Sequence, residues 1–89
     1  MRTMHKEIDV ICVFYRGKQP VPRKFKITYN NGDVQTVTVD QVNRIEQETP
    51  LGLHTIVYSC TSEVNGVLVD YIIRYYVKEM RWELYRSVA

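Results

Sequence analysis

The chain has 89 residues, of which 45% are hydrophobic and 25% charged, and its formal net charge is +2. This balance is typical of one globular domain and excludes a disordered chain, and so small a net charge predicts neither a nucleic-acid nor a membrane partner. The polar start of the chain does not resemble a secretion signal, and no run of residues reaches the length of a transmembrane helix. We therefore expect a cytoplasmic protein with its two cysteines reduced.

We predict a single domain over residues 1–89, with flexible ends at 1–5 and 87–89. The first extended run, 6–16, is dense in β-branched and aromatic residues, and a loop rich in proline and glycine ends it. The second run, 23–30, alternates apolar with polar residues, as a half-buried strand does. Asn31-Gly32 then predicts a hairpin to a third run at 34–39.

Residues 40–48 allow two interpretations. Val39, Val42 and Ile45 recur every third residue, and Asp40 has the side chain of a helix cap, which together would give one short helical turn. The alternative is that the third strand continues through a bulge that resets its alternation. We favour the bulged strand, because so short a helix would have few apolar contacts to hold it.

Three further extended runs complete the chain, at 53–61, 67–78 and 81–85, and a second Asn-Gly pair lies between the first two. Five to six strands joined by tight turns predict an all-β fold: a small antiparallel meander, curled into a strongly coiled sheet or an SH3-like barrel. The alternation places ten residues in the core: Phe25, Ile27, Tyr29, Ile56, Tyr58, Val69, Tyr71, Ile73, Tyr75 and Trp82.

The order of these features resembles a group of small uncharacterised bacterial β-rich proteins of about this length. The similarity covers residues 8–85 and rests on five short motifs: Pro22-Arg23-Lys24-Phe25, the valines Val37, Val39 and Val42, Tyr58-Ser59-Cys60, Ile72-Ile73-Arg74-Tyr75-Tyr76, and Trp82-Glu83-Leu84. The resemblance implies a fold of short antiparallel strands and carries no function with it.

The charge is unevenly distributed, at +5 over residues 1–30, −3 over 31–60 and zero over 61–89. Five cations fall within eleven residues, with no acid among them: Arg16, Lys18, Arg23, Lys24 and Lys26. Such a cluster beside tyrosines could form a nucleic-acid face for single strands on a small β-barrel. We rank this function second, because lysines on an exposed strand are more often there for solubility and for protection of a sheet edge.

The run 67–78 has one fully apolar face, and its opposite face is half apolar, with Leu68, Ile72 and Tyr76 beside Asp70 and Arg74. The first run has the same doubled character. A single sheet in a soluble monomer should leave one face of each strand in water, so another chain or a bend in the sheet must cover the second face. We therefore expect a non-catalytic protein-interaction module, most simply a homodimer in which Asp70 of one chain approaches Arg74 of the other.

An enzyme or a metal-binding domain is the least favoured alternative. The two histidines and two cysteines have no ligand spacing, and the acids at 40, 46 and 48 fit a solvated face better than a catalytic pocket. The four glycines are isolated at turns, so a phosphate-binding loop is missing from the sequence. We predict no catalytic residues, no cofactor and no bound metal.

Overall fold

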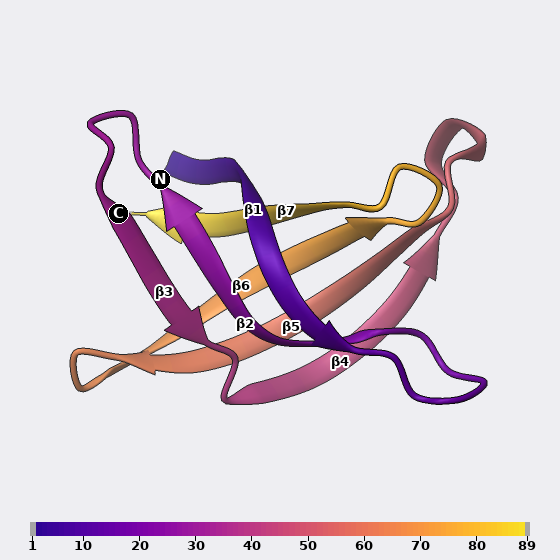
Figure 1. Ribbon diagram of the computed structural model, residues 1–89, viewed down its shortest axis with the longest axis horizontal. Coiled ribbons are helices and arrows are strands. Elements are labelled where there is room, and N and C mark those ends of the chain that lie inside the picture. Colours follow the sequence, from indigo (N-terminus) through magenta and orange to yellow (C-terminus); the bar gives the residue numbers. More distant parts are fainter. Residues whose placement is uncertain (1, 89) are drawn as a thin grey trace.

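The computed structural model describes residues 2–88 and confirms the all-β prediction. Within them, antiparallel strands form one strongly curled sheet in the order β3-β2-β1-β7-β6-β5-β4 (Figure 1). The strands are β1 (Arg2–Val13), β2 (Val21–Thr28), β3 (Val34–Thr38), β4 (Gln41–Glu48), β5 (Thr55–Val64), β6 (Val67–Tyr76) and β7 (Arg81–Val88). A single 3-10 turn, η1 (Pro50–Gly52), joins β4 to β5.

Residues 2–88 form seven strands rather than the five to six predicted, because residues 40–48 do not continue the third run. After Val39 the chain crosses from one edge of the sheet to the other, and β4 pairs with β5 instead of β2. The bulge favoured for this segment is present, since the register of β4 against β5 shifts between Val42 and Arg44. The helical turn considered for residues 40–48 is wrong, since residues 41–48 form strand β4, and the 3-10 turn η1 follows that strand.

Strand β1 begins earlier than the sequence predicts, at Arg2 rather than Lys6, and it ends at Val13. Its first half pairs with β7 through residues 2–8, and its second half pairs with β2 through residues 9–13. Of the ends expected to be flexible, residues 1 and 89 lie outside the described chain, whereas residues 2–5 and 87–88 belong to paired strands. The division of β1 between two neighbours lets the sheet curl on itself.

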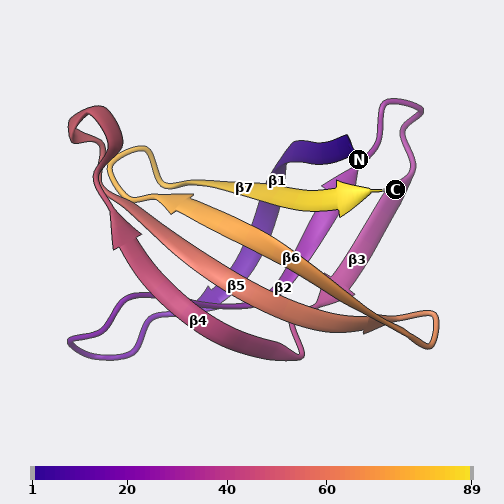
Figure 2. The same ribbon diagram turned by 180° about the vertical axis from the view of Figure 1, so that it is seen from behind.

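The curl brings two parts of the sheet face to face. Strands β1, β2 and β3 cross in front of β5, β6 and β7 in Figure 1 and lie behind them in the reversed view of Figure 2. The rings of Phe25 and Tyr71 meet edge to face across the interior, with centroids 5.4 Å apart. At the β3 edge, Ser62 Oγ of β5 donates a 2.6 Å hydrogen bond to the Thr38 carbonyl. The sheet is therefore a half-barrel with its core on the concave side.

Both Asn-Gly pairs form hairpin turns, although of different kinds. Asn65 and Gly66 both have positive φ, +52° and +79°, as the two-residue turn between β5 and β6 requires. Between β2 and β3 only Gly32 has positive φ, and the turn closes through the Gly32 amide donating to the Tyr29 carbonyl at 2.9 Å. The hairpin between β2 and β3 therefore has a longer loop than the sequence pattern suggests.

Eight of the ten predicted core residues are buried. Tyr29 and Val69 are only half-buried, yet they pack against the core. Five further residues complete the buried cluster on the concave side: Ile8, Val37, Val39, Cys60 and Leu84. Burial raises the pKa of the Cys60 thiol to about 12, so this cysteine serves as a packed apolar group rather than a nucleophile.

Candidate functional site

The outer, convex face of β6 carries all five residues of the predicted interaction face. Leu68 is 73% exposed and Ile72 37% exposed, while Asp70 is exposed and Arg74 half-buried. Asp70 accepts a 2.7 Å hydrogen bond from the Thr61 hydroxyl on β5. A shallow groove of about 600 Å³ follows this face, with Ile72 on its wall between Asp70 and Arg74.

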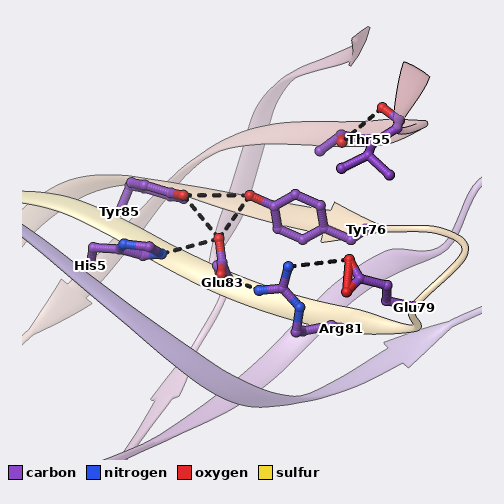
Figure 3. A network of polar contacts seen from close by, with 8 residues as sticks. His5, Thr55, Tyr76, Glu79, Arg81, Glu83 and Tyr85 are labelled. Atoms are coloured by element: carbon purple, nitrogen blue, oxygen red, sulfur yellow. Dashed lines mark hydrogen bonds and ion pairs between the residues drawn. The ribbon is translucent and has the colours of Figure 1, made fainter. Parts of the chain in front are cut away.

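Tyr76, the last of those five residues, takes part in a polar network that sequence reasoning did not find (Figure 3). Its hydroxyl donates to Glu83 Oε1 at 2.8 Å, and the hydroxyl of Tyr85 donates to the same oxygen at 2.9 Å. His5 Nε2 lies 3.1 Å from that oxygen, and Arg81 binds the other oxygen of the carboxylate. One carboxylate thus joins side chains from β1, β6 and β7.

The aromatic rings of this network are also covered. The His5 ring stacks on Tyr85 with centroids 4.4 Å apart, and the Arg81 guanidinium lies 4.2 Å from the centre of the Tyr76 ring. Arg74 lies over the other tyrosine, Tyr85, at 5.2 Å, and its guanidinium is 3.6 Å from Glu48. At the Tyr76 end of the outer face of β6 and β7, the polar and charged side chains thus have partners within the chain.

Burial alone would raise the pKa of the Glu83 carboxyl, which is only 8% exposed. The hydrogen bonds from Tyr76, Tyr85, His5 and Arg81 outweigh that effect and lower the pKa from 4.5 to about 2. A carboxylate so strongly held in its charged form is a poor proton acceptor at neutral pH. The network is therefore suited to stabilising the closure of β1 on β7 rather than to acid–base chemistry.

The five cations of the predicted nucleic-acid face are all exposed and lie on two neighbouring segments, the loop after β1 and strand β2. Lys24 and Lys26 point outward from β2, whereas Arg16 and Lys18 lie in the loop after β1. Arg23 is exposed at the bulge of β2 between Pro22 and Lys24, and it donates to the hydroxyl of Tyr15 at the rim. The cations therefore spread along one end of the molecule, around exposed apolar side chains of β1.

The histidine and cysteine side chains outside this network are placed on different parts of the sheet. His54 is exposed beside Gln47 Oε1, at 3.0 Å, while Cys12 is half-buried on the concave side. Among residues 2–88, no three His, Cys, Asp or Glu side chains are placed to hold a metal ion. In the same part of the chain, no helix is long and apolar enough to cross a membrane.

The network around Glu83 had only a partial signal in the sequence. Arg81, Glu83 and Tyr85 alternate with inward residues, so one face of β7 could be predicted. The contribution of His5 depends on the pairing of β1 with β7, which joins the two ends of the chain and has no local signature. Comparison with known proteins finds no matching family model, no matching curated protein and no matching solved structure.

Proposed function

We propose that the protein is a self-associating module that forms a two-fold dimer through the outer face of β6. The observation that carries this proposal is the pattern along the groove, where the apolar Ile72 lies between one acid, Asp70, and one base, Arg74. A two-fold axis through Ile72 reverses the direction of the partner strand. Asp70 of each chain then faces Arg74 of the other, and the two Ile72 side chains meet at the axis.

The same axis brings Leu68 of one chain toward Tyr76 of the other. Leu68 is among the most exposed large apolar side chains of the described chain, at 73%, and it would meet the exposed part of the half-buried Tyr76, which Arg81 leaves uncovered. Full burial of a leucine or isoleucine side chain contributes about 1.5–3 kcal/mol, and the symmetry repeats each contact. The two ion pairs would set the orientation more than the affinity.

Charge reversal tests this interface with a result that misfolding cannot imitate. In homodimers, Asp70→Arg places two arginine pairs in contact, and Arg74→Asp places two acid pairs in contact, so each variant should sediment as a monomer at concentrations where the wild type is a dimer. Mixing the two variants restores both opposite-charge pairs, and a heterodimer should form. Wild-type monomers at 100 micromolar, or no association in the mixture of folded variants, would contradict the proposal.

Because Arg74 also contacts Glu48 and Tyr85, a second pair of variants avoids it. Ile72→Asp and Ile72→Lys should each be monomeric and should associate when mixed. Leu51→Asp is the matched control, since Leu51 is fully exposed at η1 and outside this face. If Ile72→Asp remains a dimer like the control, the outer face of β6 is not the interface.

A further inference from the structure

The end of β1 carries the densest exposed apolar run of the described chain. Ile11 is 65% exposed, Val13 36%, Phe14 67% and Tyr15 44%. Ile11 and Val13 point outward because their neighbours Val10 and Cys12 face the core. Ile11 and Phe14 leave about two thirds of their surface in water, so their exposure is the feature that needs a reason.

Cations surround this run. Lys24 is the direct cross-strand partner of Ile11, and Arg16 and Lys18 follow Phe14 in the loop. Lys26 lies opposite Asp9, the only acid at this end of the strand pair, and residues 10–32 contain five basic residues and no acidic one. The net charge of +2, from which no membrane partner is expected, averages over this local excess and the acidic segment that follows it.

The shape of this end presents the run outward. The loop between β1 and β2 projects beyond the strands at one end of the molecule in both views (Figures 1 and 2). Its inner side is anchored, because the hydroxyl of Tyr58 donates to the carbonyl of Pro20 and both Pro20 and Pro22 are buried. The anchored side leaves Phe14 directed away from the core, with the cations beside it.

We propose that this protruding end binds the surface of anionic phospholipid bilayers. Phe14, Ile11 and Val13 would enter the boundary between headgroups and acyl chains, while Arg16, Lys18 and Lys24 contact the lipid phosphates. One observation favours a bilayer over single-stranded nucleic acid. Half of the exposed apolar run, Ile11 and Val13, has no aromatic face on which bases could stack, whereas every member of the run can enter the acyl boundary.

The binding test uses sedimentation with vesicles of phosphatidylcholine containing 30% phosphatidylserine, compared with pure phosphatidylcholine. The wild type should bind the anionic vesicles at least tenfold more tightly, and binding should weaken with salt. Phe14→Ser and the double variant Lys18→Glu, Lys24→Glu should each reduce binding at least tenfold, whereas Leu51→Ser should not. Equal binding by Phe14→Ser and the wild type, or no binding to anionic vesicles, overturns the proposal.

Insertion has its own readout, which separates it from purely electrostatic adsorption. A tryptophan at position 14, introduced as Phe14→Trp, should shift its emission to the blue on anionic vesicles and be quenched by brominated acyl chains. Leu51→Trp, the matched control, should do neither. Binding to a fluorescent oligothymidine without binding to vesicles would overturn the proposal in favour of a nucleic-acid surface.

Discussion

Two regions of the molecule differ in how far the fold provides partners for their side chains. Beside β7, an almost buried carboxylate, Glu83, has every available partner it needs: two tyrosine hydroxyls, a histidine and an arginine. At the end of β1, by contrast, the large apolar side chains of Ile11 and Phe14 are about two-thirds exposed. The fold supplies the partners of the Glu83 carboxylate, whereas it leaves the apolar side chains at the end of β1 exposed.

The difference teaches where stability and binding reside in this molecule. A buried charge that lost its partners would destabilise the folded state, so the partners of Glu83 contribute to the stability of the fold. Exposed apolar groups impose no such requirement, since Ile11 and Phe14 keep most of their hydration when the chain folds. Substitutions in the first region should therefore change stability, and substitutions in the second should change only association.

The largest effect is expected from removing the carboxylate. Glu83→Ala leaves Arg81 with Glu79 as its one remaining carboxylate and takes the acceptor away from two half-buried tyrosine hydroxyls. We expect the free energy of unfolding in urea to fall by about 3 kcal/mol. The exposed Glu46→Ala is the control, with an expected change below about 0.5 kcal/mol. Equal losses in the two variants would show that the network contributes nothing beyond a surface charge.

The same network predicts a pH dependence with a definite sign. The folded-state pKa of Glu83, about 2, lies below the ordinary value of 4.5, so its stabilisation is fully present above pH 4.5 and disappears as the pH falls toward 2. The depressed pKa corresponds to roughly 3 kcal/mol. The stability difference between wild type and Glu83→Gln should thus narrow between pH 5 and pH 2. A difference that stays constant over that range would assign the effect of the substitution to shape rather than charge.

The tyrosine hydroxyls should contribute less. Tyr76→Phe and Tyr85→Phe each remove one hydrogen bond to Glu83 and retain the ring, so each should lower stability by about 1 kcal/mol. Combined with Glu83→Ala, either substitution should have almost no further effect, because the acceptor of the hydroxyl is then already gone. Strict additivity in this double-mutant cycle would contradict a shared network. Tyr15→Phe, at the exposed rim, is the matched control.

The concave side of this fold could be predicted from the sequence, since burial there follows from local alternation. Ile27, Ile56 and Ile73 each lie in a run where every second residue is apolar, and all three are buried. The same alternation assigned Leu68, Ile72 and Tyr76 to the opposite face of β6, where they lie. Alternation depends only on the period of a strand, so it holds whatever the strand pairs with.

Contacts that depend on which strands meet could not be predicted. His5 reaches Glu83 because β1 pairs with β7, and Val39 precedes a crossing that sends the chain to the opposite edge of the sheet. Neither event has a local pattern of residues, since each is decided by how the whole sheet curls. The five cations illustrate the same limit, because the bulge that exposes Arg23 between Pro22 and Lys24 depends on how β1 pairs with β2.

The smallest effect on stability is expected in the second of the two regions, at the end of β1. Phe14→Ser removes a ring that is 67% exposed in the folded chain, so folding buries little of its apolar surface. The free energy of unfolding should therefore change by less than about 0.5 kcal/mol. Phe25→Ser is the contrast, because Phe25 lies in the core at 3% exposure, and it should lower the free energy of unfolding by about 4 kcal/mol. Urea denaturation of both variants measures the difference. A large loss in Phe14→Ser would mean that this side chain packs within the chain, and the surface at the end of β1 would then serve the fold rather than a partner.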